Sequence, residues 1–340
     1  MMSGLYVLGG SSIVIENLAD QLCKRGVEVT IGALLFKRFP PKGAYEVAAI
    51  PVGNILKLKR FLENFDIIHN HHPITNYLAL VSRKPFMYHY HGAPDFGWGN
   101  LLRYSMLPSI KITNHYIDAV IAVSETAGAE LKRLFSLDKV HVVYDCVDTT
   151  LFKPGLKEKF RKGSPQLLFV GNLYKHKNVG ELIFALKELV KEYPEAYLQI
   201  VGHGRMYGYL KHLIAGLGLE NNVELVGRVS SFELPYYYAS CDVYITASRW
   251  ELFGLPLLEA MACGKPVVAS SIPSHVELIT KAKAGITYTA GEIDVLCKNI
   301  IRAHEASDKY RSNALFFAKE HDWSVMADQT LRIYAEILHR

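Results

Sequence analysis

The sequence predicts an α/β protein built from two doubly wound parallel sheets. Short apolar runs rich in β-branched residues alternate with segments of helical periodicity along all 340 residues. A polar stretch with glycine and proline, residues 155–165, separates two halves that each open with a strand, a turn and a helix. A chain of this length suits two domains, which we expect at residues 1–154 and 165–321.

The composition is ordinary for a soluble protein and argues against several classes. Lys and Arg exceed Asp and Glu by five, but the excess is spread along the chain, so a nucleic-acid surface is not predicted. The five cysteines are far apart and lie in apolar runs, which favours buried thiols in a reducing compartment. No run approaches the roughly 18 apolar residues of a membrane span, and no signal-peptide pattern opens the chain. We therefore expect a cytoplasmic protein.

The first half opens on a pattern typical of a Rossmann fold. We expect a strand at residues 5–8, a turn at Gly9 and Gly10, a helix over 12–25 and a strand at 27–31. Glycine amides at a helix N-terminus suit a phosphate, although a lone glycine pair more often marks a plain tight turn. The next elements expected are strands at 66–73 and 86–92 and a strand and helix over 118–135.

Histidines gather at the ends of the strands expected at 66–73 and 86–92. Imidazole is a common metal ligand, so a metal site is one interpretation. No acidic or cysteine ligand lies at a recognisable spacing, so packed or hydrogen-bonded histidines are the favoured alternative. The residues are His69, His71, His72, His89 and His91.

Two stretches of the first half suit an apolar or membrane partner. Residues 93–117 are aromatic and apolar, which fits a helix packed on the sheet or an acceptor surface. Residues 52–65 form an apolar helix with Lys57, Lys59 and Arg60, compatible with contact to anionic lipid and with an ordinary surface helix.

The second half repeats the strand and helix pattern from residue 166, with units at 196–206 and 221–242. Lys175 and Lys177 follow its first strand, at the carboxyl edge of the sheet, where a diphosphate needs cationic neutralisation. Without further context, two loop lysines are simply solvated.

Residues 241–285 carry the strongest functional signal. A buried strand, a loop with glycine and proline, a short helix and a second strand form a βαβ unit. Glu251 stands where the first strand ends and Glu259 eight positions later in the helix, while Phe253, Gly254 and Leu255 supply amides at the helix start. Carboxylates suit sugar hydroxyls and amides suit phosphate, so a nucleotide sugar is the natural ligand for this pattern. A bare pair of glutamates at this spacing is more often two solvated acids that flank a helix.

The run from Glu251 to Ser270 resembles the signature of retaining glycosyltransferases of the GT-B type, group 1 or family 4. It matches E-x-F-G-L-P-x-x-E-A-M-A-x-G-x-P-V-V-A-S, including Ala260, Gly264 and Pro266. The resemblance implies two Rossmann-like domains that face a central cleft, with the acceptor on the first and the donor on the second. It also implies that a last helix, expected at 322–340, crosses back to the first domain.

The resemblance implies roles for individual residues. Glu251 would hold the hydroxyls of the donor sugar, Glu259 the ribose diol, and His91, followed by Gly92, would touch the sugar from the first domain. Lys177 would bind the diphosphate. The remaining donor-binding positions are Gly9 and Gly10 beside the diphosphate, Asn172, Lys175, main-chain groups of Arg228 and Val229 around the base, and the amides of Phe253, Gly254 and Leu255.

Three departures from the family pattern bear on this assignment. Asn172 replaces an arginine, which removes a charge at the diphosphate, and Lys175 is the nearest compensating cation. Asp145 and Cys146 stand where Asn-Gly is usual. Only eight residues precede Gly9, so either the first strand is abbreviated or the natural start lies upstream.

The sequence therefore predicts a retaining glycosyltransferase. It would move a hexosyl group from a UDP- or GDP-sugar to a hydroxyl of a glycan, a lipid-linked acceptor or a small molecule. We expect no cofactor and no metal, because the sequence lacks Asp-x-Asp and lysine and amide donors can replace the cation. We assign no covalent nucleophile. The alternatives are a nucleotide-sugar binding protein without turnover and a nucleotide-sugar epimerase of the same architecture.

Overall fold

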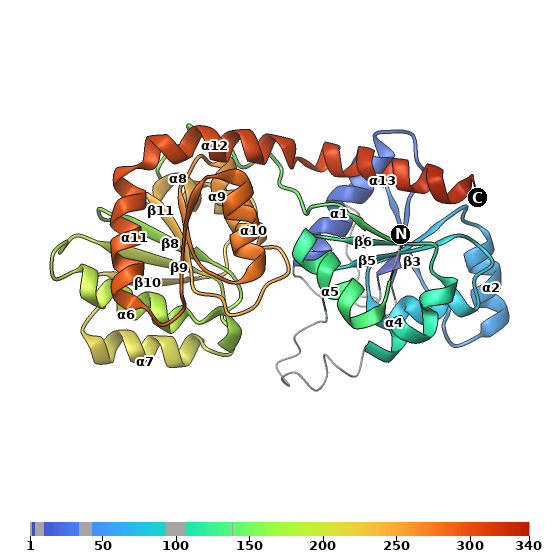
Figure 1. Cartoon of the computed structure of the whole chain (residues 1–340), viewed down its shortest axis with the longest axis horizontal. Coiled ribbons are helices and arrows are strands. Elements are labelled where there is room, and N and C mark those ends of the chain that lie inside the picture. The colour runs from blue at the N-terminus through green and yellow to red at the C-terminus, as the bar shows by residue number, and fades with distance from the viewer. Residues whose placement is uncertain (1, 4–9, 34–42, 93–106, 138, 340) are drawn as a thin grey trace. The chain divides into compact units, whose positions relative to one another are not determined.

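The computed structural model describes residues 2–3, 10–33, 43–92, 107–137 and 139–339. The chain forms two compact units. Figure 1 colours the chain from blue at the N-terminus to red at the C-terminus. Unit 1 comprises residues 1–146 and 323–340, and unit 2 comprises residues 147–322. The expected strand at residues 5–8 and Gly9 lie outside the described residues, as do residues 93–106 of the aromatic stretch.

Unit 1 contains a parallel sheet with the described strand order β3-β2-β1-β4-β5-β6-β7. The order reverses between β1 and β4, which is the switch point of a doubly wound sheet. The strands are β1 (Met2–Ser3), β2 (Thr30–Ala33), β3 (Glu46–Ala49), β4 (Ile68–Asn70), β5 (Phe86–Tyr90), β6 (Ala119–Ala122) and β7 (Val140–Val142).

The helices of unit 1 begin where the sequence provides caps. The side chain of Asn54 accepts hydrogen bonds from two amides of α2, and that of Ser124 accepts one from Ala127 in α5 at 2.9 Å. The last helix belongs to this unit, because Arg25 donates to Asp328 at 2.6 Å and to the Ser324 carbonyl at 2.9 Å. The helices are α1 (Gly10–Cys23), α2 (Ile55–Glu63), η1 (Pro73–Leu80), α4 (Leu107–Thr113), η2 (Asn114–Tyr116), α5 (Glu125–Phe135) and α13 (Trp323–Leu338).

Unit 2 contains a second parallel sheet, with the order β10-β9-β8-β11-β12-β13. Its switch point lies between β8 and β11, so the loops after these two strands emerge side by side at one edge. The strands are β8 (Gln166–Val170), β9 (Tyr197–Val201), β10 (Val223–Gly227), β11 (Val243–Thr246), β12 (Val267–Ser270) and β13 (Gly285–Tyr288).

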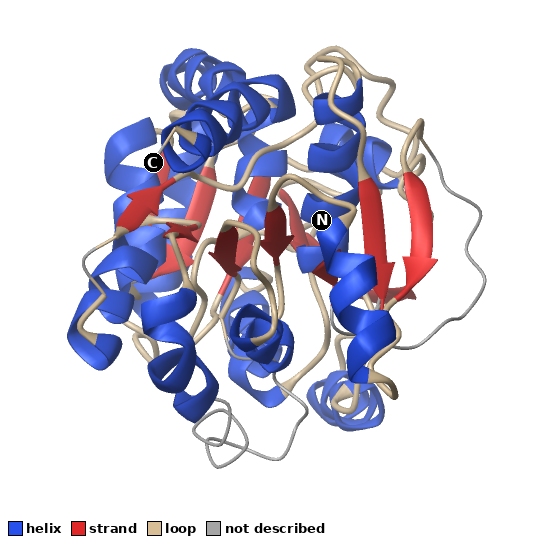
Figure 2. Cartoon of the chain, turned by 90° about the vertical axis from the view of Figure 1, so that its right-hand side faces the viewer, coloured by secondary structure: helices blue, strands red, loops and turns tan. Residues whose placement is uncertain are grey.

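Helices pack against the unit 2 sheet through a core of buried apolar side chains that includes Leu167, Phe169 and Ile245. Figure 2 shows the strands of the chain in red and its helices in blue. The helices are η3 (Lys175–Lys177), α6 (Val179–Leu189), α7 (Tyr207–Leu217), α8 (Leu234–Ser240), α9 (Leu255–Ala262), α10 (Pro273–Ala282), α11 (Ile293–Glu305) and α12 (Ser307–Glu320). Over the described part of the chain, no helix combines the length and the apolar character needed to cross a membrane.

The stretch expected to link the domains packs as part of unit 2. The ring of Phe160 stacks on that of Tyr237 with centroids 4.0 Å apart, and Arg161 forms two hydrogen bonds with the Asp242 carboxylate. Residues 147–154, which we expected in the first domain, also lie in unit 2, where the Val147 amide donates to the His321 carbonyl at 2.9 Å. The polar composition of this stretch therefore did not mark a free linker.

Candidate active site

Lys177 and Glu251 meet at the switch point of unit 2. Lys177 ends η3 in the loop after β8, and Glu251 lies in the loop after β11. The Lys177 Nζ donates to Glu251 Oε1, and the Ser248 Oγ donates to the same oxygen at 2.9 Å. Only 15% of the lysine side chain and 19% of the glutamate side chain are exposed. The two residues predicted to face the leaving group and the sugar thus form one largely buried ion pair.

The surroundings of Glu251 keep it ionised. Burial by itself would raise the pKa of Glu251, but the positive charge of Lys177 opposes it, and so do the hydrogen bonds from Lys177 and Ser248. The net effect is a pKa below the usual value for glutamate. Ser274, at the start of α10, donates to the Glu251 carbonyl at 3.0 Å and ties the loop to the sheet edge. Glu251 is therefore a fixed, charged acceptor.

The loop after Glu251 turns into α9 at Gly254, whose φ of 114° lies in the left-handed region. A Cβ at this position would come within 3.1 Å of the Leu257 side chain and 3.6 Å of the His275 ring. Both the backbone angle and the crowding favour glycine. The first amides of α9, beginning with that of Leu255, therefore stand at the same edge as Glu251, with Phe253 buried beneath the turn.

Glu259 lies one turn further along α9 and differs from Glu251 in its charge state. The Tyr238 hydroxyl donates to Glu259 Oε2 at 2.6 Å. Burial raises the pKa of Glu259 to about 7, because the single hydrogen bond offsets little of the lost hydration. The pair of glutamates thus combines one carboxylate held ionised with one that titrates near neutral pH.

The other predicted donor residues of unit 2 lie around the same edge. Asn172 is exposed in the loop after β8, and Arg228 and Val229 follow β10 at the far side of β9. Lys175 is exposed at the start of η3 and lines a separate hollow of about 500 Å³ instead of contacting Glu251. Among the described residues, Lys177 is the cation that pairs with Glu251.

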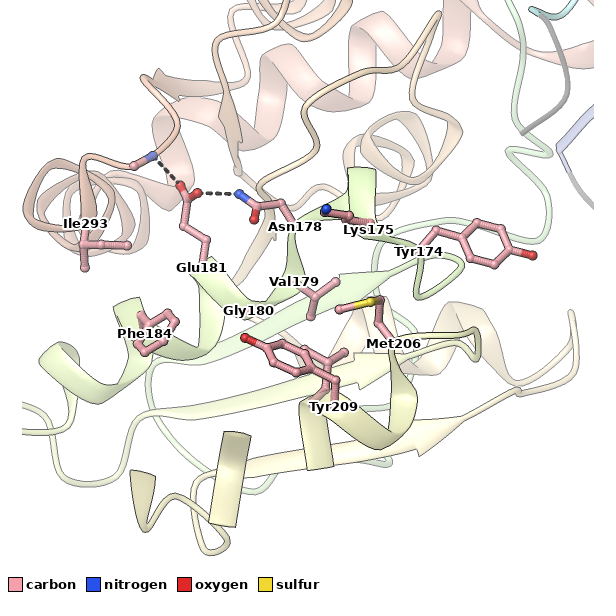
Figure 3. A pocket seen from close by; sticks show the side chains of 12 residues that line it. Tyr174, Lys175, Asn178, Val179, Gly180, Glu181, Phe184, Met206, Tyr209 and Ile293 are labelled. Atoms are coloured by element: carbon pink, nitrogen blue, oxygen red, sulfur yellow. Dashed lines mark hydrogen bonds between the residues drawn. The ribbon is translucent and has the colours of Figure 1, made fainter. Parts of the chain in front are cut away.

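The hollow beside Lys175 is formed by η3 and the first turns of α6 and α7. Figure 3 shows Met206 and Tyr209 beside Val179, with Lys175 and Asn178 above them. The acidic residue of the hollow, Glu181, is already hydrogen-bonded within the protein: it accepts from the Tyr288 hydroxyl and the Gly291 amide, each at 2.9 Å. The hollow is largely apolar, and we assign no part of the predicted donor site to it.

In unit 1, Gly10 begins α1, two residues before the expected start of this helix, and His91 follows β5. The His91 ring stacks on that of His89, with centroids 4.3 Å apart, and its Nε2 lies 2.9 Å from the Nδ1 of His71. Burial lowers the pKa of His91 to about 3, so the ring is neutral. The structure thus places Glu251, Lys177 and Glu259 together in unit 2, and Gly10 and His91 in unit 1.

Sequence reasoning missed four polar residues of the unit 2 site: Tyr238, Ser248, Ser274 and His275. His275 is fully buried, and its Nδ1 lies 3.1 Å from the Ser270 carbonyl. Burial lowers the pKa of His275 to about 4, and the Nε2 has no hydrogen-bond partner in the described structure. The signal available was a Ser-His pair opening a helix directly after the strand Val267–Ser270.

Comparison with known proteins places this geometry in a family. Residues 156–314 match the model of group 1 glycosyl transferases, and residues 8–151 match the model of glycosyltransferase family 4. An uncharacterized glycosyltransferase of Methanocaldococcus jannaschii is 28% identical, over 96% of this chain and 94% of its own. D-inositol 3-phosphate glycosyltransferase 2 of Catenulispora acidiphila is 25% identical, over 96% and 90%.

Solved structures agree on the fold. The Anabaena protein HepE in complex with UDP has a TM-score of 0.82 at 22% identity and covers 98% of both chains. The lipopolysaccharide glycosyltransferase WaaG has a TM-score of 0.75 at 16% identity, over 98% of this chain and 99% of its own. Both family models, which together cover most of the chain, and the two doubly wound units lead to one conclusion: the chain belongs to the group 1, family 4 glycosyltransferases and has the GT-B fold.

Proposed function

We propose that this glycosyltransferase moves a hexosyl group from a nucleoside-diphosphate sugar to a hydroxyl acceptor with retention of configuration. The observation that carries the proposal is the buried Lys177–Glu251 pair at the switch point of unit 2. Parallel sheets bind nucleotides at such points. The complexes of HepE with UDP and with UDP-glucose support a uridine nucleotide as the first donor to test.

The chemistry requires stabilisation of opposite charges on the two sides of the breaking bond. As the bond between the sugar C1 and the phosphate oxygen breaks, its electron pair stays on the diphosphate, whose charge Lys177 and the amides at the start of α9 would stabilise. The sugar becomes oxocarbenium-like, and Glu251 would hold its hydroxyls. The acceptor oxygen bonds to C1 on the face that the diphosphate leaves, and its proton passes to the departing phosphate. In this scheme, lysine and amides supply the charge stabilisation without a metal at the diphosphate.

Glu259 and the edge of β10 complete the donor site in this proposal. Glu259 would accept hydrogen bonds from the ribose diol, and main-chain groups of Arg228 and Val229 would flank the base. Asn172 would donate hydrogen bonds to the diphosphate without adding charge, with Lys175 as a second cation in the same loop. The contact of His91 with the donor sugar stays a prediction.

For the acceptor we propose a glycan or a lipid-linked molecule. In unit 1, Ile55 and Leu56 are exposed at the start of α2, on a helix that also carries Lys57 and Lys59. An apolar and basic helix surface of this kind fits peripheral contact with an anionic membrane, where a lipid-linked acceptor would be found.

The test is release of nucleoside diphosphate from a panel of UDP- and GDP-sugars, with acceptor extracts and with EDTA present and absent. We expect one donor to be turned over, and Lys177→Met and Glu251→Gln each to lower kcat by about 100-fold or more. The matched controls are Lys191→Met and Glu188→Gln, which alter an exposed ion pair in the same unit. Tight nucleotide binding with no release for any donor would contradict the proposal and indicate a binding protein.

A further inference from the structure

Four histidine rings form a compact cluster in unit 1, whereas the ion pair described above belongs to unit 2. His69 and His71 come from the end of β4, and His89 and His91 from the end of β5. Residues two apart on a strand point to the same face, and these strands are paired in parallel. Neighbouring rings have centroids 4.2 to 5.3 Å apart. Four imidazoles therefore share one patch of the sheet.

Several nitrogens of the cluster are buried without a hydrogen-bond partner among the described residues. They are His69 Nε2, His71 Nε2 and both ring nitrogens of His89. Leaving such groups unsatisfied in the interior is costly, so native proteins rarely do it. These three rings are buried, and an imidazole in its neutral form has one nitrogen lone pair that a cation can take.

Asp145 adds a carboxylate to this patch from the segment after β7. Its side chain is buried and its Oδ1 has no partner in the described part of the chain. Among the described residues, no hydrogen-bond donor offsets the hydration that this oxygen loses. A buried carboxylate is retained without a partner only at a cost that a bound cation would remove. The same position is one of the departures from the family pattern, which has asparagine there.

We propose that His89, His91 and Asp145 bind one divalent transition-metal cation, of which Zn²⁺ is the first to test. One ligand atom from each of the three residues lies within 4.8 Å of the others. A tetrahedral ion with bonds of about 2.0 Å needs its ligands about 3.3 Å apart. Because the rings of His89 and His91 are stacked at 23° and imidazole lone pairs lie in the ring plane, metal binding would require these rings to turn. Two imidazoles and one carboxylate are a ligand set that Zn²⁺ and Fe²⁺ accept.

The neighbouring groups fit the second layer of such a site. The Nε2 of His91 lies 2.9 Å from the Nδ1 of His71, which leaves the Nδ1 of His91 for the metal and fixes the ring. The Nδ1 of His69 lies 2.8 Å from the Tyr334 hydroxyl of α13, so a hydrogen bond to the last helix fixes the orientation of the His69 ring. His91 is the least buried of the proposed ligands, which gives the ion a way in.

A second set, His69, His71 and His89, also lies within metal-binding distance. It contains no negative ligand, so a dication there would add two uncompensated charges to a fully buried place. The set with Asp145 neutralises one of these charges and removes the unpartnered carboxylate. We therefore favour the set that contains Asp145.

This site changes what His91 can do. With one ring nitrogen on His71 and the other on the cation, His91 would have no nitrogen left for the predicted contact with the donor sugar. The metal site shares His91 with the proposed function, whereas the ion pair and Glu259 belong to unit 2, and neither Asp145→Asn nor His89→Gln alters His91. Metal binding and glycosyl transfer can therefore be tested separately.

The experiment is a titration of the chelator-treated full chain with Zn²⁺, followed by calorimetry, and with Co²⁺, followed by its visible absorption. We expect one ion per chain and a rise in Tm with metal. Asp145→Asn and His89→Gln should each weaken binding at least tenfold, whereas Asp66→Asn and His115→Gln, at exposed positions of unit 1, should bind as the unaltered chain does.

Asp145→Asn keeps the proposal testable if His89→Gln fails to fold. It removes the buried carboxylate at nearly constant shape, so the metal-free variant should melt no lower than the unaltered chain while losing the metal-dependent rise. Unchanged metal affinity in Asp145→Asn would overturn the proposed ligand set. If His69→Gln abolished binding in the same series, the all-histidine set would hold the ion instead. Absence of one-to-one binding in the unaltered chain would overturn the site altogether.

Discussion

Replacing Lys177 by methionine tests whether the buried ion pair of unit 2 behaves as the structure indicates. Methionine keeps most of the side-chain length and removes the charge, so among the described residues Ser248 remains as the side chain that donates a hydrogen bond to Glu251. Removing one partner of a buried pair typically costs 3 to 5 kcal/mol. Because the two side chains are 15% and 19% exposed, we expect the lower end, about 3 kcal/mol.

The reverse change should cost less. In Glu251→Gln, the freed ammonium of Lys177 stands on a flexible stem and can reach water, so we expect a loss of about 1 kcal/mol. In the double variant no charge is left unpaired, and its loss should be smaller than the sum of the two single losses. This asymmetry distinguishes an uncompensated buried carboxylate from a simple loss of contacts.

Thermal unfolding followed by calorimetry or circular dichroism measures the effect. For a unit of this size, about 3 kcal/mol corresponds to a fall in Tm of roughly 6 to 12 °C. Because the pair holds the pKa of Glu251 low, its contribution is present above the unfolded pKa of about 4.3 and is lost as the pH falls through the lower folded value. The difference between Lys177→Met and the unaltered chain should therefore shrink in acid. A Tm within 2 °C of the unaltered chain at pH 7 would refute the reasoning, and so would equal losses in the two single variants.

Two further predictions concern α9. The raised pKa of Glu259, about 7, means that the folded unit binds this proton more tightly than the unfolded chain, so stability should fall by up to about 3 kcal/mol as the pH rises from about 4.3 to 7 and then level off. Glu259→Gln should flatten that slope in a pH series of denaturant titrations, and an unchanged slope would contradict the assignment. Gly254→Ala should destabilise unit 2 by about 1 to 3 kcal/mol, because alanine is strained at a φ of 114°. Ala260→Gly, in the same helix, provides a control for loss of helix propensity, about 1 kcal/mol, and a smaller effect at Gly254 than at this control would argue against strain.

The sequence predicted the fold well because its signals are local. Runs such as Val243–Thr246 and Val267–Ser270 are mostly apolar, as is typical of strands buried on both faces, and both are fully buried strands of the sheet. The expectation of a polar linker failed for a related reason. Phe160 and Arg161 sit in a polar stretch, and only the fold reveals that Tyr237 and Asp242 are there to receive them. The composition of a stretch does not reveal which residues, some 80 positions away in the sequence, its side chains will contact.

The candidate site likewise has features that the local sequence predicts and contacts that only the fold reveals. Glu251 and Lys177 could each be placed at the carboxyl edge of a strand, but their contact depends on β8 and β11 being neighbours, which is a property of the strand order. The histidines show the limit most clearly. The spacing predicts that His89 and His91, at the end of β5, share a face. Asp145 follows β7 and lies more than 50 positions further along the chain, so a search for a ligand at a fixed spacing could not find Asp145.

The Lys177–Glu251 pair also suggests how a site for a charged donor can be buried before the donor arrives. An unpaired lysine and an unpaired glutamate would each lose hydration here, whereas together they compensate one another. On the proposed function, the donor diphosphate would compete with Glu251 for Lys177, and the hydroxyls of the sugar would take the lysine's place at the carboxylate. Neither charge would then be left without a partner at any stage. Because the donor would have to break the Lys177–Glu251 contact, the free energy of that contact would be subtracted from the affinity for the donor. The same contact would keep both side chains in position while the site is empty.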